Sequence, residues 1–358
     1  MKDVYRILSI NPGSTSTKIA VYDNEKQLME KTLRHSSEEI AKYPAIIDQL
    51  DFRKEVITDA VIEAGIKIES LDAVVARGGM LKPIIGGTYA VNKLMIDELK
   101  VGARGQHASN LGAIIANEIA SKNNAPSFIV DPPVVDEMED LARVSGSPLI
   151  PRISAFHALN QKAIAKRAAK EMGKKYEELN LIVVHMGGGI SVGVHKNGKI
   201  IDVNNALNGE GPLTPERAGT LPAGQLVDLC FSGQYSKDEL KTSLFRKGGM
   251  VAYLNTSDGR EVNKRVTEGD KEAELIYRAM AYQVAKEVGA AATVLEGKID
   301  AICITGGLAY DKMLMGWIQD RISFLGQIRF YPGEDEMIAL AQGALRVLTG
   351  EEKALEYK

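Results

Sequence analysis

The sequence has little of several features that mark specialised classes of protein. Its 358 residues include one tryptophan and two cysteines. Neither Cys230 nor Cys303 has a second cysteine or a histidine at metal-ligand spacing, so we expect two buried thiols and no disulfide framework. No run of about 18 apolar residues occurs, and the opening residues lack the apolar core of a signal peptide. We therefore expect a cytoplasmic protein.

An excess of charge of either sign is also lacking. The 44 basic residues stand against 47 acidic ones, which leaves a formal net charge of -3. Such a chain presents no broad positive field, so neither nucleic acid nor a membrane is an expected partner. Low-complexity tracts and heptad arrays are absent too, which argues against a filament or scaffold protein. Any anionic ligand must be held by local groups.

The chain is long enough for two domains, and its pattern of elements repeats. Periodicity predicts strands over residues 4–10, 17–23, 31–34, 71–76, 127–131, 181–186, 190–197, 199–205 and 300–304, and helices over 44–65, 107–123, 221–231, 237–245, 270–295 and 335–348. Each half opens with a three-stranded meander, and placing His185 under Asn11 superposes the two, which indicates an internal duplication. We predict an α/β fold with domains at 1–150 and 151–334, a cleft between them, and the C-terminal segment 335–358 packed back on the first domain.

The first meander contains the turn NPGSTSTK, rich in glycine and hydroxyl groups. Backbone N–H groups and hydroxyls in such a turn can converge on a phosphate, although an ordinary serine- and threonine-rich hairpin has the same composition. It is not a P-loop, because no helix follows directly. The candidate phosphate contacts are Asn11, Gly13, Ser14, Ser16 and Lys18.

The second half has two glycine turns at strand ends. His185 precedes Gly187, Gly188 and Gly189, where missing side chains would let a polyphosphate approach the backbone. Gly306 and Gly307 end an apolar strand and open a predicted helix, which suits the ribose or α-phosphate of a nucleotide. Turns from both halves, facing each other, would hold a nucleotide triphosphate.

Eight motifs, taken in order, resemble the acetokinase family, which contains the acetate and butyrate kinases. They are NPGSTSTK, ARGG, FIVDPP, AFHALNQKA, HMGGG with a following KNGKIID, GEGPLTPERAG, ITGGLAYD and YPGEDEM. The resemblance spans nearly the whole chain and looks closer to the butyrate branch. It implies the fold shared with sugar kinases, heat-shock ATPases and actin: two ribonuclease H-like domains, each a mixed five-stranded sheet with flanking helices. It also implies ATP and Mg²⁺ as cofactors, a small carboxylate substrate on the first domain, and nucleotide binding and the interface of a homodimer or higher homo-oligomer on the second.

The resemblance further implies roles for individual residues. It implies catalytic roles for Arg77, Asp131, His157 and Arg217. It implies Mg²⁺ binding by Glu336 and Asp131, with Glu334 and Asp335 as alternatives to Glu336. The implied substrate pocket is lined by Gly78, Gly79, Phe156 and Pro215. Asp202 is a candidate for holding a metal-bound water. For each residue an ordinary structural role stays open, such as a surface ion pair, a capping carboxylate or a core histidine.

Three positions depart from the pattern of acetate kinase. Leu221 replaces a second active-site arginine, for which Arg217 is the candidate substitute, and Gln161 replaces a second histidine. Gly79 replaces a valine that closes the acyl pocket, so we interpret it as room for extra methylene groups, each worth about 0.8 kcal/mol when buried.

The predicted reaction is the reversible phosphorylation of butyrate by ATP, by direct in-line transfer. The alternatives are a kinase for isobutyrate or other branched acids, a kinase for acetate or propionate, and, in a different class, an ATP-driven binding module of the actin or heat-shock type.

Overall fold

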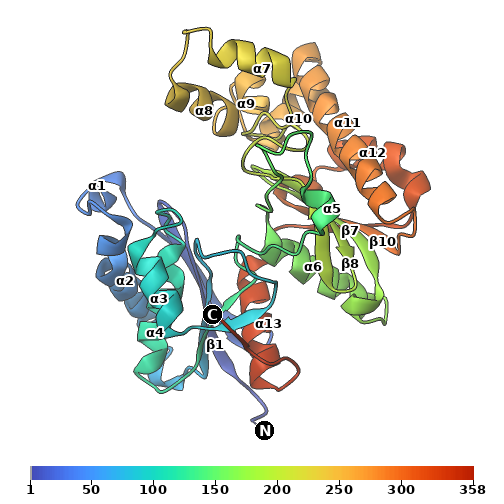
Figure 1. Ribbon diagram of the computed structural model, residues 1–358. Helices are drawn as coiled ribbons and strands as arrows, with labels where there is room; N and C mark the ends of the chain where they lie inside the picture. Colours follow the sequence, from blue (N-terminus) through green and yellow to red (C-terminus); the bar gives the residue numbers. More distant parts are fainter. Residues whose placement is uncertain (1) are drawn as a thin grey trace. The chain divides into compact units, whose positions relative to one another are not determined.

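The computed structural model describes residues 2–358, and the chain divides into two units (Figure 1). The first comprises residues 2–136 together with Asp335–Lys358, and the second is Glu137–Glu334. The division precedes the predicted boundary at residue 150 because the intervening segment bonds to the second unit. The carboxylate of Glu137 accepts the N–H of Ile200 at 2.8 Å, and the N–H of Glu139 donates to the carbonyl of Ile201 at 2.9 Å.

The first unit contains a mixed sheet in the order β12-β5-β6-β4-β1-β2-β3. The strands are β1 (Arg6–Pro12), β2 (Ser16–Asp23), β3 (Lys26–Arg34), β4 (Ala73–Arg77), β5 (Thr88–Ala90), β6 (Ser127–Val130) and β12 (Leu355–Glu356). Seven strands correct the predicted five, because the short strands β5 and β12 extend the sheet beyond β6. Both are too short to give a periodic signal in the sequence.

The α-helices of this unit are α1 (Ser37–Ile40), α2 (Leu50–Glu63), α3 (Lys93–Val101), α4 (Asn110–Ser121) and α13 (Glu336–Leu348). Among the described residues, all of them except α1 bury side chains. Ile57 of α2 and Ile115 of α4 share one core with Ile10 and Val74 of the central strands. Helix α13, red in Figure 1, contacts β1 and β4, so the C-terminal part of the chain completes the first unit.

The second unit repeats the arrangement with a sheet in the order β11-β10-β7-β8-β9. Its strands are β7 (Asn180–Met186), β8 (Ile190–Lys196), β9 (Lys199–Val203), β10 (Ala301–Gly306) and β11 (Ile328–Pro332). In both sheets the first strand pairs antiparallel with the second and parallel with the fourth. Asn11 and His185 each occupy the sixth position of a seven-residue strand. The predicted duplication is therefore confirmed in strand order and alignment, while the predicted cleft stays a prediction.

The helices of the second unit are α5 (Asp140–Arg143), α6 (Ala158–Glu171), α7 (Ala223–Cys230), α8 (Lys237–Phe245), α9 (Met250–Leu254), α10 (Gly259–Thr267), α11 (Lys271–Val294) and α12 (Lys312–Ile322). Within residues 2–358, none of the helices combines the length and apolar character that a membrane crossing requires.

The two cysteines differ in their surroundings. Cys303 is buried in β10, and burial raises the pKa of its thiol to about 12. Cys230 is exposed, so the prediction that it is buried is wrong. The reason is that α7 carries apolar residues but buries none of them within the chain.

Candidate functional site

The turn between β1 and β2 is built around a buried arginine. Arg53 of α2 is fully buried, and its guanidinium donates to the carbonyl oxygens of Gly13 at 2.8 Å, Ser14 at 3.0 Å and Ser16 at 3.2 Å. Its Nε donates to the side-chain oxygen of Gln49 at 3.0 Å. The carbonyls of the turn are thereby directed at Arg53, and the hydroxyl-bearing residues at its tip are exposed.

Arg53 contacts no carboxylate among residues 2–358. Burial lowers its pKa, yet an arginine stays protonated in proteins. The turn therefore lies over a positive charge that, among the described residues, is compensated only by neutral groups, the carbonyls and the hydroxyl of Thr17. An anion bound on the exposed side of the turn would be attracted by that charge, and this supports the interpretation of the turn as a phosphate site.

Three predicted residues meet at one edge of the first sheet. Asn11 donates from Nδ2 to Oε2 of Glu336 at 2.6 Å, and Arg77 lies 3.3 Å from Oε1 of the same carboxylate. Asn11 is near the end of β1, Arg77 ends β4 and Glu336 begins α13. The ion pair with Glu336 orients the guanidinium, and because Arg77 is only partly exposed, water screens its charge less than at the surface.

Asp131 directly follows β6 at the same edge. It is buried and has a φ of 38°, a conformation that is unusual for a residue other than glycine. Its Oδ1 accepts the N–H of Gly87 at 2.7 Å. One carboxylate oxygen thus has the loop-capping role that the sequence left open. The predicted metal-binding role stays a prediction.

Gly79 does not open a substrate pocket, which corrects the sequence interpretation. A Cβ at this position would lie 2.6 Å from the Cα of Asn110 and 2.8 Å from the side chain of Leu99. At Gly78, a Cβ would lie 2.6 Å from Cβ of Pro132. The space that both missing side chains leave is filled by the protein itself. No acyl-chain preference can be argued from these glycines.

Lys18 and Asp202 both have ion-pair partners within the protein. Lys18 pairs with Glu30 of β3 at 2.8 Å, and Asp202 pairs with Arg152 at 2.9 Å. Ion pairs of this kind are ordinary features of a protein surface or boundary.

In the second unit two predicted histidines stack. The rings of His157, at the start of α6, and His185, near the end of β7, lie 3.9 Å apart with an angle of 19° between their planes. Nδ1 of His185 bonds to Asn160 at 2.8 Å, and its Nε2 lies 3.5 Å from Glu334. The preceding residue, Phe156, is buried.

Charged side chains occupy the space left by the glycine run. A Cβ at Gly188 would lie 3.1 Å from a carboxylate oxygen of Glu216, and one at Gly189 would lie 1.9 Å from Nη1 of Arg217. The third glycine of the run, Gly187, leaves room for Glu334 and His185 in the same way. The run therefore lets charged groups approach the strand end closely.

Arg217 is the best candidate for an anion ligand in this unit. Its Nη1 is buried and has no hydrogen-bond partner among residues 2–358, and burial lowers the pKa of the guanidinium. A buried donor without a partner is costly, and a phosphate oxygen would satisfy it. Pro215, two residues earlier, is buried and accepts the N–H of Val251 at 3.0 Å through its carbonyl.

The Gly306 turn differs from its prediction in one respect. Gly306 has a φ of 95°, and a Cβ there would lie 2.3 Å from the carbonyl oxygen of Met186, so close strand contact requires glycine. Gly307 opens a short 3₁₀ turn, Gly307–Tyr310, and the α-helix begins only at Lys312. The prediction that a helix begins at the two glycines is therefore wrong.

Several supporting residues were not predicted. Arg53 is one, since its carbonyl partners are about forty positions earlier in the chain and the sequence offers no local signal. Asn160 and Glu216 lie inside the recognised motifs AFHALNQKA and GEGPLTPERAG, so attention to every polar residue of those motifs could have found them. Within residues 2–358, no three histidine, cysteine, aspartate or glutamate side chains are grouped as a metal site.

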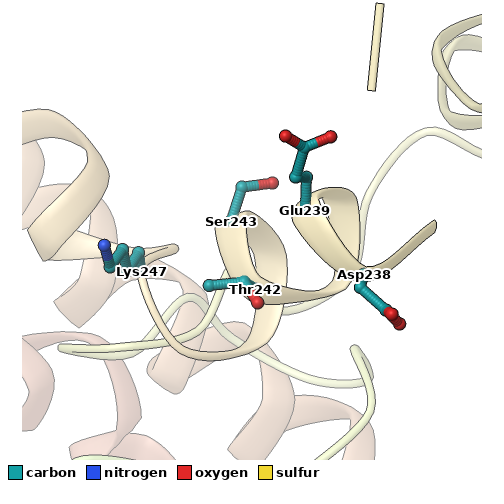
Figure 2. Close-up of a pocket in the computed structure, with 5 residues that line it drawn as sticks. All are labelled: Asp238, Glu239, Thr242, Ser243 and Lys247. Atoms are coloured by element: carbon teal, nitrogen blue, oxygen red, sulfur yellow. The ribbon is translucent and has the colours of Figure 1, made fainter. Parts of the chain in front are cut away.

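A hollow on the surface lies along α8. Figure 2 shows it, lined by Asp238, Glu239, Thr242, Ser243 and Lys247. Asp238 points away from Glu239 and Ser243, so the polar groups do not converge on one ligand position. We assign no site to this hollow.

The chain matches known proteins in sequence and in structure. The acetokinase family matches residues 149–326. Butyrate kinase 1 of Clostridium acetobutylicum is 61% identical over 355 residues, which cover 99% of this chain and 100% of the relative, and butyrate kinase 2 of that organism is 58% identical over 354 residues, 99% of each. The structure of acetate kinase from Porphyromonas gingivalis matches with a TM-score of 0.79 at 18% identity, covering 96% of this chain and 100% of the other. At that identity the likeness concerns the fold, and it confirms the predicted fold class.

The buried arginine leads to a test of stability. Replacing Arg53 by Met should lower the free energy of unfolding by on the order of 3 kcal/mol, because the turn carbonyls lose a charged donor. Urea denaturation measures this value. Arg6→Met is the matched control: its ion pair with Asp23 is partly exposed, so the loss should stay near or below about 1 kcal/mol. Equal losses in the two variants would contradict the role assigned to Arg53.

Proposed function

The chain belongs to the acetokinase family, and on that premise we propose that it is a butyrate kinase. The reaction transfers the γ-phosphoryl group of ATP to the carboxylate of butyrate, gives ADP and butyryl phosphate, and is reversible. The observation that carries the proposal is the near-complete coverage of two butyrate kinases at 61% and 58% identity. The preference for butyrate rests on those relatives, since protein atoms fill the space beside Gly79.

The reaction requires the protein to position the two substrates and to stabilise negative charge. A carboxylic acid with a pKa near that of a glutamate side chain, about 4.3, is ionised at neutral pH and needs no general base. The obstacle is the repulsion between two anions. Positive charges and hydrogen-bond donors that face the transferred group lower that barrier, and no covalent enzyme intermediate is required.

In the first unit, we assign Arg77 to the substrate carboxylate. Its pairing with Glu336 orients the guanidinium and leaves other N–H donors for the substrate. Glu336 and Asp131 would hold Mg²⁺ together with phosphate oxygens, since this ion commonly uses one or two carboxylates in nucleotide sites. When bound, Mg²⁺ neutralises part of the phosphate charge.

In the second unit, we assign ATP phosphates to Arg217 and the glycine run. The buried, unpartnered Nη1 of Arg217 is the feature that fits an anion. The acidic Glu216 beside Gly188 would repel a bare phosphate, which favours a metal-bound nucleotide over a free one. His157 is assigned a hydrogen bond to the transferred phosphoryl group.

We further propose a homo-oligomer with α7 at an interface. Val227 and Phe231 are 54% and 86% exposed, and none of the residues of α7 is buried. An apolar helix that buries nothing within its own chain is typical of a surface that meets a partner. The cytoplasmic location predicted from the sequence stays a prediction.

A series of acids tests the proposed reaction. With MgATP and acids from acetate to valerate, including isobutyrate, acyl phosphate trapped as hydroxamate should form fastest with butyrate. Arg77→Ala should lower kcat roughly 100- to 1,000-fold, the scale for losing one donor to a charged transition state. A fastest rate with acetate, propionate or isobutyrate would contradict butyrate as the preferred substrate but would still indicate a carboxylate kinase. ATP turnover without dependence on any acid would instead support an ATP-driven binding module.

Light scattering after size exclusion tests the interface. Phe231→Asp should convert the oligomer to monomer, because a charge would lie in an apolar contact. Phe324→Asp is the control, since Phe324 is 81% exposed elsewhere in the same unit, and it should leave the mass unchanged. A monomeric parent chain, or equal effects of the two changes, would contradict the assignment to α7.

A further inference from the structure

A chain of hydrogen bonds runs from His157 into the core of the second unit. Nδ1 of His157 is 2.9 Å from Oγ of Ser191, which is 2.8 Å from Nε2 of Gln161. Oε1 of Gln161 is 3.1 Å from Nε2 of His195, whose Nδ1 is 2.7 Å from the hydroxyl of Tyr176. The residues beyond His157 are all buried.

One backbone carbonyl determines the donor and acceptor directions along this series of hydrogen bonds. The amide nitrogen of Gln161 lies 3.1 Å from the carbonyl oxygen of Ser191, which can only accept. The group at that position must therefore be the NH₂, and the amide oxygen must face His195. A Cβ at Gly193 would lie 2.1 Å from that oxygen, so the glycine leaves the space that the amide occupies.

The orientation of the Gln161 amide determines where the other residues of this hydrogen-bond network carry their protons. His195 must carry its proton on Nε2 to donate to the amide oxygen. Burial, and then the nearby charge of Lys162, hold the pKa of His195 well below its usual range, so the ring is neutral and Nδ1 accepts from Tyr176. Toward the other end, Ser191 accepts from Gln161, and among residues 2–358 its Oγ has no further partner than His157. Its hydroxyl proton therefore points to Nδ1 of His157.

We propose that Gln161 is a positioning residue that fixes the tautomer of His157, so that the neutral imidazole carries its proton on Nε2. This inference rests on the proposed function for its purpose: the ring donates a hydrogen bond to an anionic phosphoryl group without first taking up a proton. His195 and Tyr176 support the amide from behind. In a carboxylate kinase this arrangement supplies a donor at neutral pH and avoids charging two stacked histidines.

Nitrogen NMR of histidine reads the tautomer directly. The chain has five histidines, so the signals of a ¹⁵N-histidine sample can be assigned by comparison with His157→Asn. At pH 8, above the usual histidine pKa of about 6.5, the parent protein should show a protonated Nε2 and a bare Nδ1 at His157. A protonated Nδ1 there would overturn the proposal.

Two variants test the role of the amide. Gln161→Glu removes the donor, so the serine proton should turn to the new carboxylate and His157 should shift its proton to Nδ1. We expect kcat to fall on the order of 10- to 100-fold, with little change in the KM values. Gly193→Ala should displace the amide sterically and lower kcat in the same direction.

Val183→Ala is the control for lost stability, because Val183 is a buried residue of β7 outside the chain of hydrogen bonds. It should lower the melting temperature and leave both the tautomer and kcat unchanged. An unchanged tautomer in Gln161→Glu, or a kcat loss no greater than in Val183→Ala, would overturn the proposal. The NMR result does not need turnover. The expected tautomer without acid-dependent turnover would support the positioning role and reject the proposed function.

Discussion

The parallel pairing of β1 with β4, and of β7 with β10, is the interaction on which the cluster of candidate residues in each unit depends. Residue Ile10 pairs with Ala76, so the next residues along the two strands, Asn11 and Arg77, emerge at one edge. His185 pairs with Thr305 in the same way. Because parallel strands end together, polar side chains that follow buried apolar runs are collected where ligands of α/β proteins commonly bind.

Much of this arrangement could be predicted because it is local in the sequence. Helix α8 has the predicted bounds, the long helix α11 differs by one residue at each end, and the strands of the two meanders overlap the predicted ranges. Helix α6 was missed, since the alanine-rich face that it buries gives a weak apolar signal beside its many lysines. The edge strands β5 and β12 are stabilised by neighbours far away in sequence, and a two- or three-residue strand has no periodicity to detect.

The errors at the site have a common physical origin. Gly79 looked like an opened pocket, but a glycine shows only that a side chain is missing, and here Asn110 fills the space. The glycine run similarly makes room for Glu216 and Arg217. Arg53 was overlooked because its partners are backbone carbonyls, which every residue has. Whether a gap holds ligand or protein is decided by tertiary packing, which the sequence pattern does not report.

In the proposed reaction, a carboxylate oxygen attacks the γ-phosphorus of ATP. The most direct measurement uses butyrate labelled with ¹⁸O in both carboxyl oxygens, MgATP and the full chain, followed by ³¹P NMR. We expect ADP and butyryl phosphate whose bridging oxygen carries the label, seen as an isotope shift of the phosphorus signal. Release of unlabelled inorganic phosphate without acyl phosphate would contradict it.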